Sequence, residues 1–224
     1  MRRASGGRID DREGYDEGAW WSQDAAAALP ARLVGDNLTG QDVADLCAAP
    51  GGKTLQLAAR GAKVTAVDVS GARLNRIAEN LARVRLTAET VEADVAEWKP
   101  DRTFDAVLLD APCSASGTIR RHPDILHLKR QEDVDALVRI QSRLLDRAAE
   151  FVRPGGRLIY CTCSLGRAEG ESRIQSFLDR HAEFERNPIS PGEACIEAEW
   201  ITREGALRTL PMQTPRGDGE ERGM

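Results

Sequence analysis

The most constraining feature of this sequence is a regular alternation of short apolar runs and longer amphipathic runs between residues 43 and 180. The apolar runs have the length and composition of strands, and they lie at 43–47, 63–68, 87–93, 104–110 and 157–163. The amphipathic runs are typical of helices, and they lie at 57–60, 71–84, 130–152 and 169–180. This alternation predicts an α/β fold in which helices cover both faces of a mostly parallel central sheet.

Length and composition restrict the class of protein further. With 224 residues, of which 41% are hydrophobic and 30% charged, the chain fits one globular domain with tails. No apolar run approaches the roughly 20 residues that cross a bilayer, so we expect no membrane partner. No apolar segment follows the basic N-terminus, so we expect no signal peptide. The formal charge of −5 argues against binding nucleic acid by bulk charge alone, but it permits a local basic groove.

The cysteines favour a reducing cytoplasm, because their number, five, is odd and the chain is long enough to form its own core. The usual spacings of zinc ligands do not occur in the sequence, and we expect no metal site. Cys47 and Cys161 fall within expected strands and are interpreted as small core residues. Nothing in the sequence around Cys195 indicates a function for it. Cys113 follows one expected strand and Cys163 stands at the carboxyl end of another, where parallel sheets bind ligands.

Acidic residues stand at the ends of three successive expected strands. Asp68, Asp94 and Asp110 would meet at one edge of the sheet, because parallel strands end on the same side. A single aspartate at the end of a strand is more often a solvated surface residue than a ligand-binding one. Three together match the groups that S-adenosyl-L-methionine offers, which are a ribose diol, an adenine amine and a charged amino acid.

The Gly-rich segment 51–54 raises a second possibility, because it resembles the end of the P-loop pattern G-x-x-x-x-G-K-[ST]. The first glycine of that pattern would fall on Cys47, and Pro50 lacks an N–H in a loop that would have to donate N–H groups to phosphates. A P-loop NTPase is therefore disfavoured. A nucleoside cofactor without a triphosphate remains, since Gly51 and Gly52 let the backbone approach a ligand closely.

Three sequence motifs together resemble a known family. These motifs are 45–54, 110–114 with 120–124, and 160–165 with 169–171. In this order they resemble the RsmB/Nop2/Sun RNA 5-methylcytosine methyltransferases, and most of all the bacterial RsmB type that acts on 16S rRNA. The resemblance covers roughly residues 15–190. It implies a class I methyltransferase fold (Rossmann-like) with S-adenosyl-L-methionine as the methyl donor.

The resemblance also implies which residues hold the cofactor. The loop that follows the first strand would line it, mostly by backbone atoms, through Cys47, Ala48, Ala49, Pro50, Gly51, Gly52 and Lys53. Asp68 would hold the ribose and Asp94 the adenine side. Asp110 would lie between the methionine end of the cofactor and the target base.

For catalysis, the resemblance implies Cys163 as the nucleophile and Cys113 as the helper in product release. Cytosine C5 is a poor nucleophile, and a thiolate that adds to C6 activates it. Asp110, protonated toward N3 of the base, would favour that addition. The nucleophile needs a lowered pKa, and we expect Lys53 and the sulfonium of the cofactor to supply the positive charge. The base must leave any stack to reach the site.

The partner expected from the resemblance is RNA. Arg120, Arg121, Lys129 and Arg130 follow the loop of Cys113 and could meet phosphates, although a solvated loop would look the same. The preferred substrate is 16S rRNA. The alternatives left open are a tRNA cytosine-C5 methyltransferase and an inactive fragment that binds cofactor or RNA. We expect a monomer.

The chain departs from the family at both ends. The RsmB branch usually carries an N-terminal NusB-like domain, which is absent from this sequence. The family usually ends in a strand with Asp-Gly-Phe-Phe, whereas Asp218 and Gly219 are followed here by Glu220 and Glu221. We therefore expect the last strand of the sheet to be missing or altered. The expected organisation is an irregular arm over 1–18, the methyltransferase domain over 19–210 and a disordered tail over 211–224.

Overall fold

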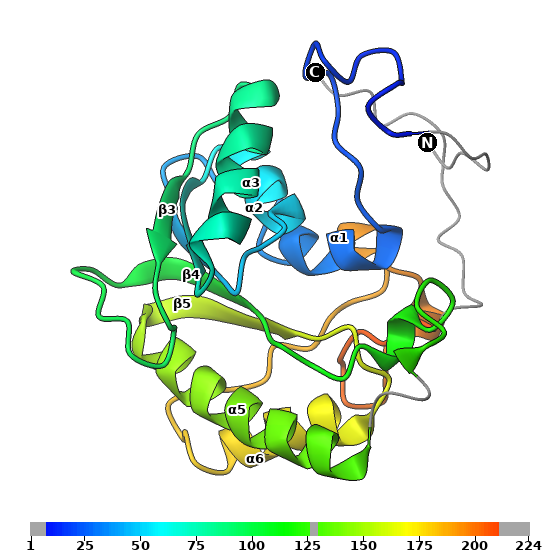
Figure 1. Cartoon of the computed structure of the whole chain (residues 1–224). Helices are drawn as coiled ribbons and strands as arrows, with labels where there is room; N and C mark the ends of the chain where they lie inside the picture. Colours follow the sequence, from blue (N-terminus) through cyan, green and yellow to red (C-terminus); the bar gives the residue numbers. More distant parts are fainter. Residues whose placement is uncertain (1–7, 126–129, 211–224) are drawn as a thin grey trace.

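The computed structural model describes residues 8–125 and 130–210, and it forms a parallel sheet between two layers of helices (Figure 1). The strands are β1 (Asp42–Leu46), β2 (Lys63–Asp68), β3 (Glu89–Glu92), β4 (Phe104–Asp110) and β5 (Val152–Cys161). Within the described residues their order is β3-β2-β1-β4-β5, and every adjacent pair is parallel. The order reverses direction at β1, which is where sheets of this kind bind ligands.

The α-helices lie on both sides of this sheet. They are α1 (Ala25–Arg32), α2 (Gly52–Ala59), α3 (Gly71–Arg83), α5 (Gln131–Glu150) and α6 (Glu171–Leu178). In Figure 1, α1, α2 and α3 lie on one side of the sheet, and α5 and α6 lie on the other. Short 3₁₀ turns occur at Ser116–Thr118, Arg167–Glu169, Glu193–Cys195 and Ala198–Trp200. The α/β fold predicted from the alternation is confirmed.

The central strands are apolar because both of their faces are covered. In β1 the residues Val43 and Leu46 are fully buried, and in β4 the run 106–109 is at most 2% exposed. Leu108 of β4 packs with Val43 on the side of α1 and α2, while Leu109 packs with Leu145 of α5 on the other side. Alternate residues of one strand therefore belong to two separate halves of the core.

The first helix, α1, is short, with eight residues. The Asp24 carboxylate accepts hydrogen bonds from the backbone N–H groups of Ala26 and Ala27, so this N-cap sets the start of α1 at Ala25. Pro30 lies inside α1, which ends two residues later at Arg32. Pro30 is therefore accommodated inside this short helix and does not end it.

The fifth strand begins earlier and ends earlier than expected. Val152 pairs with Phe104, and after an irregularity Arg157 pairs with Ala106, so the Pro-Gly-Gly segment 154–156 bulges within β5 rather than preceding it. Pairing ends where Cys161 meets Asp110. Cys163 therefore lies in the loop beyond β5, two residues past the strand.

The segment after α6 crosses over α1 instead of adding a strand in the part of the chain that the structure describes. Trp200, 2% exposed, packs with Ile196 against Leu29 of α1. Ile201 and Leu207 form an isolated antiparallel bridge. The expected tail at 211–224 lies outside the described residues.

No helix among the described residues is long and apolar enough to span a membrane.

Candidate active site

The loop between β1 and α2 forms one wall of the site. The chain leaves β1 through Cys47, which has a left-handed φ of 57°, and enters α2 through Gly51, with φ of 97°. A Cβ on Gly51 would lie 2.9 Å from Cγ1 of Ile77 on α3, so the close packing of this loop requires a glycine. Burial, followed by the charge of Asp68, raises the pKa of Cys47 to about 12, so this thiol is a neutral core group.

Asp68 holds this loop in place from the end of β2. Its carboxylate is 2% exposed and accepts hydrogen bonds from the N–H groups of Ala49 (3.1 Å) and Ser70 (3.1 Å). Arg73 of α3 lies 3.4 Å from the same carboxylate and donates to the carbonyl oxygen of Ala49 at 2.6 Å. Arg73 is a site residue that the sequence analysis missed, and its only signal was its place in the first turn of the helix after Asp68.

Asp94 lies next to Asp68 at the edge of the sheet, since the preceding Ala93 N donates to Asp68 O at 3.1 Å. It follows β3, its side chain is 48% exposed, and its carboxylate caps Ala96 N and lies 3.7 Å from Arg143 of α5. Neither Asp68 nor Asp94 lines the main cavity of the described residues, whereas Ala48, Pro50 and Gly52 do.

A buried acid lies beneath the same loop. Asp45 in β1 is fully buried and accepts a hydrogen bond of 2.6 Å from the hydroxyl of Thr54. Its second oxygen, Oδ1, has no partner among the described residues. Burial is the largest influence on this carboxyl, and it raises its pKa to about 7 despite the Thr54 hydrogen bond.

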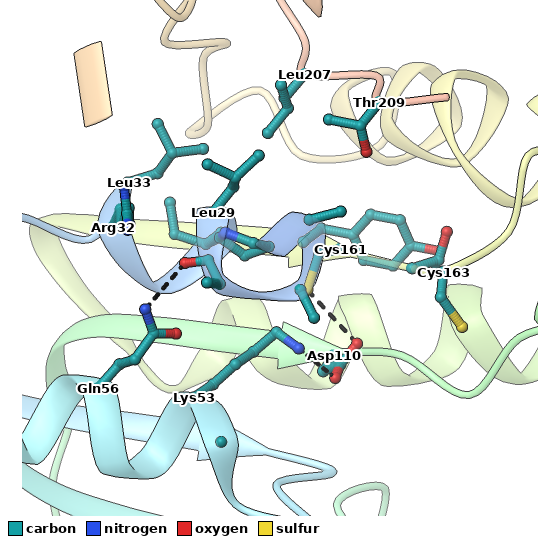
Figure 2. A pocket seen from close by; sticks show the side chains of 18 of the residues that line it. Leu29, Arg32, Leu33, Lys53, Gln56, Asp110, Cys161, Cys163, Leu207 and Thr209 are labelled. Carbon is teal, nitrogen blue, oxygen red and sulfur yellow. Dashed lines mark hydrogen bonds and ion pairs between the residues drawn. The ribbon is translucent and has the colours of Figure 1, made fainter. Parts of the chain in front are cut away.

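Lys53 and Asp110 form the ionic centre of the site. Figure 2 shows Lys53 reaching from α2 to Asp110 at the end of β4, with Cys161 on the other side of the carboxylate. Lys53 Nζ lies 2.7 Å from Asp110 Oδ2, and Cys161 Sγ lies 3.6 Å from Oδ1. Burial opposes the charge on Lys53, but Cys161 and Asp110 outweigh it and raise the Lys53 pKa to about 12. Burial, followed by the charge of Asp110, raises the Cys161 pKa well above its usual value.

The two loop cysteines meet beside this ion pair. Cys113 Sγ and Cys163 Sγ are 3.3 Å apart, although 50 residues separate them in the chain. The hydrogen bond from Cys113 is the largest influence on Cys163 and lowers its pKa to about 7, against burial and the charge of Asp110. The pKa of Cys113 moves the other way, well above its ordinary value. A large fraction of Cys163 is therefore thiolate at neutral pH, with Cys113 as its hydrogen-bond donor.

The main cause of the lowered Cys163 pKa is not the one expected from the sequence. Lys53, expected from the sequence as a source of positive charge, does lower the Cys163 pKa. Its contribution is smaller than that of the Cys113 hydrogen bond. No motif distance could have shown this, because the contact depends on two loops that follow different strands.

The basic residues expected at an RNA surface divide into three groups. Arg120 and Arg121 line the same cavity as Cys163, and Arg121 lies 3.3 Å from Asp24 at the start of α1. Arg130 caps α5, where its N–H donates to Asp133. Lys129 lies outside the described residues.

In the part of the chain that is described, no group of three or more His, Cys, Asp or Glu residues could hold a metal ion.

With this geometry in view, the comparisons with known proteins identify the family. The profile described as 16S rRNA methyltransferase RsmB/F matches residues 35–219. The chain belongs to this RsmB/F family. The ribosomal RNA small subunit methyltransferase B of Erwinia tasmaniensis is 44% identical over 224 residues, which cover 98% of this chain and 49% of the relative. The Vibrio cholerae protein of the same name is 40% identical over 194 residues, or 83% of this chain and 44% of the relative.

Solved structures give the same assignment for this RsmB/F chain. A crystal structure of PH0851 superposes with a TM-score of 0.79 at 33% identity, covering 92% of this chain and 47% of that one. NSun6 from Pyrococcus horikoshii with SFG superposes with a TM-score of 0.73 at 26% identity, covering 84% and 50%. The predicted family, the class I fold and S-adenosylmethionine as the family's methyl donor are thereby confirmed. The chain spans about half the length of the curated relatives it matches.

Proposed function

We propose that this chain transfers a methyl group from S-adenosylmethionine to C5 of a cytosine in 16S rRNA, through a covalent bond between Cys163 and C6 of the base. The observation that carries this proposal is the pair of thiols 3.3 Å apart, next to the Lys53–Asp110 ion pair. The matching relatives named as small subunit methyltransferase B support 16S rRNA as the substrate.

The residues present fit the cofactor. Asp68 offers the ribose diol the lone pairs that Ala49, Ser70 and Arg73 leave free. Val69, beside it, is 67% exposed, an apolar side chain that suits a nucleoside surface. We assign the adenine side to Asp94 and the methionine end to the loop 47–53 and Asp110. When bound, the cofactor supplies an electrophilic methyl group. NSun6 with SFG, an analogue of this cofactor, supports the assignment.

The chemistry then follows from the two thiols. The Cys163 thiolate adds to C6, and the electrons of the C5–C6 double bond make C5 nucleophilic enough to take the methyl group. Loss of the C5 proton to a base and expulsion of the Cys163 sulfur restore the double bond. We assign Cys113 to this release step, because its sulfur is the one in contact with the departing Cys163 sulfur. Asp110 is assigned to the N3 side of the base, and Lys53 to holding Asp110 in position.

Arg120 and Arg121 are the residues we assign to RNA phosphates, since both line the cavity that contains Cys163. Loss of a phosphate contact weakens RNA binding and makes the remaining binding less sensitive to salt. Phosphate contacts by this local basic pair would allow a chain of net charge −5 to bind a polyanion.

A trapping experiment tests the covalent step. The Cys113→Ala variant is incubated with S-adenosylmethionine and 16S rRNA and examined on a denaturing gel. The expected result is a protein–RNA adduct that accumulates because release is blocked, and that is absent from the double variant Cys113→Ala/Cys163→Ala. A Cys113→Ala protein that methylates RNA and leaves no adduct would contradict the roles of the two cysteines. Adducts formed with tRNA in preference to 16S rRNA would contradict the substrate.

A further inference from the structure

A buried carboxylate lies directly behind the two thiols. Glu169 is 1% exposed and stands at the end of the 3₁₀ turn Arg167–Glu169. Its Oε1 accepts from Ser114 N and from Gln141 Nε2, both at 2.9 Å. Its Oε2 accepts from the hydroxyls of Ser114 and Ser164, both at 2.5 Å. Four hydrogen-bond donors thus converge on one side chain, and all four are neutral groups.

These donors are adjacent to the reactive sulfurs. Ser114 follows Cys113, and Ser164 follows Cys163. Gln141 of α5 also donates to the carbonyl of Pro112 at 2.8 Å, which ties the same loop to the helix behind it. A carboxylate is suited to this role because, when ionised, it only accepts hydrogen bonds and can take two at each oxygen.

From this convergence we infer that Glu169 is a positioning residue that joins the loop of Cys113 to the loop of Cys163 and so holds the two sulfurs in hydrogen-bond contact. The inference deepens the proposed function and rests on it for the roles of the two cysteines. Glu169 touches neither sulfur among the described hydrogen bonds, so it acts through Ser114 and Ser164.

The network keeps this acid ionised. Burial alone raises the pKa of Glu169, but the hydrogen bonds from Ser114 and Ser164 outweigh it, and the pKa lies below its ordinary value. A negative charge near a thiol disfavours the thiolate. A role as a charge and a role in positioning therefore predict opposite effects on Cys163 when Glu169 is neutralised.

Glu169→Gln is the decisive variant, because its amide keeps the size but replaces one acceptor with a donor. The readout is the rate at which iodoacetamide alkylates Cys163 as a function of pH, with Cys163 resolved from Cys161 by mass spectrometry. We expect the midpoint to rise by about one pH unit, so that alkylation at pH 7 slows by several-fold and at most about tenfold. Glu183→Gln is the matched control, since Glu183 is an exposed partner of His181 away from both loops, and its midpoint should not move.

A purely structural role for Glu169 would lower the melting temperature and leave the Cys163 midpoint in place, and a charge role would lower the midpoint. Either result overturns the inference. Should Glu169→Gln fail to fold, Ser114→Ala and Ser164→Ala each release one loop and should each raise the midpoint; no change in both overturns it. Alkylation requires neither RNA nor cofactor. If Glu169→Gln shifts the midpoint while the wild-type chain transfers no methyl group, the proposed function is therefore refuted and the positioning role stands.

Discussion

At the residue scale, the cysteines show how position alone separates residues of one type. Cys161 and Cys163 are two residues apart, yet the pKa of the first is raised well above its usual value and that of the second is lowered to about 7. The sequence could separate them, because Cys161 falls within the expected strand 157–163 and Cys163 stands at its carboxyl end. It could not predict the 3.3 Å contact between Cys113 and Cys163, which depends on the packing of two distant loops.

The first prediction concerns the pH dependence of Cys163. Since its pKa is lowered to about 7, the thiolate fraction and the alkylation rate should rise with pH and reach half their maximum near pH 7. Cys113→Ala removes the main cause of the shift and should move that midpoint up toward the ordinary thiol value of about 8.5. Cys195→Ala, at an exposed cysteine outside the site, serves as the control. A midpoint that stays near pH 7 in Cys113→Ala would contradict Cys113 as the main cause of the lowered pKa.

The second prediction concerns Asp45. Its folded pKa of about 7 exceeds the ordinary value of 3.8 for this side chain, so the folded state binds the proton more tightly than the unfolded state does. The contribution of Asp45 to stability therefore falls as pH rises from about 4 to 7. Asp45→Asn removes that dependence, and its melting temperature relative to wild type should increase across this window. A difference that stays constant from pH 5 to pH 8 contradicts the raised pKa.

At the scale of elements, the glycine at the start of α2 decides how closely the loop approaches α3. Gly51 has a positive φ, and a Cβ there would meet the Ile77 side chain at 2.9 Å. Sequence reasoning could recognise that a Gly-rich turn lies here, because it follows a strand and opens a helix. It could not find Ile77 as the neighbour, nor Arg73 as the residue that binds Ala49 O, because both contacts come from the next helix.

A pair of substitutions tests this packing. Gly51→Ala combines a left-handed backbone with a steric overlap, and it should destabilise the fold by about 2–4 kcal/mol. Gly40→Ala has a similar φ of +81° but nothing within 4 Å of its Cβ, so only the backbone cost of about 1–2 kcal/mol is expected. Urea unfolding of both variants gives the comparison. Equal losses would show that the contact with Ile77 relaxes freely.

At the scale of the whole molecule, the alternation along the chain was enough to predict the parallel sheet. It was weaker where regular periodicity stops. The bulge at 154–156 and the packing of Trp200 on α1 depend on tertiary contacts that no local pattern encodes. Glu169 illustrates the same limit within the site: its motif was visible, but its partners Ser114 and Ser164 became apparent only once the two loops were brought together.

The C-terminal segment provides a prediction at this scale. Trp200 is 2% exposed and packs with Ile196 on Leu29, so Trp200→Ala should leave a cavity and cost about 3–5 kcal/mol. Ile140→Ala, at a side chain that is 43% exposed on α5, should cost under about 1 kcal/mol. Thermal or urea unfolding compares the two. Similar small losses would show that the segment after α6 contributes little to the folded chain.

The most direct test of the account is methyl transfer to RNA. The protein is incubated with S-adenosylmethionine labelled in the methyl group and with 16S rRNA, and the labelled nucleoside is identified and its position mapped. Label is expected in 5-methylcytosine at a defined position, and none is expected with Cys163→Ala. Label on another atom or base, or undiminished transfer by Cys163→Ala, would contradict the account.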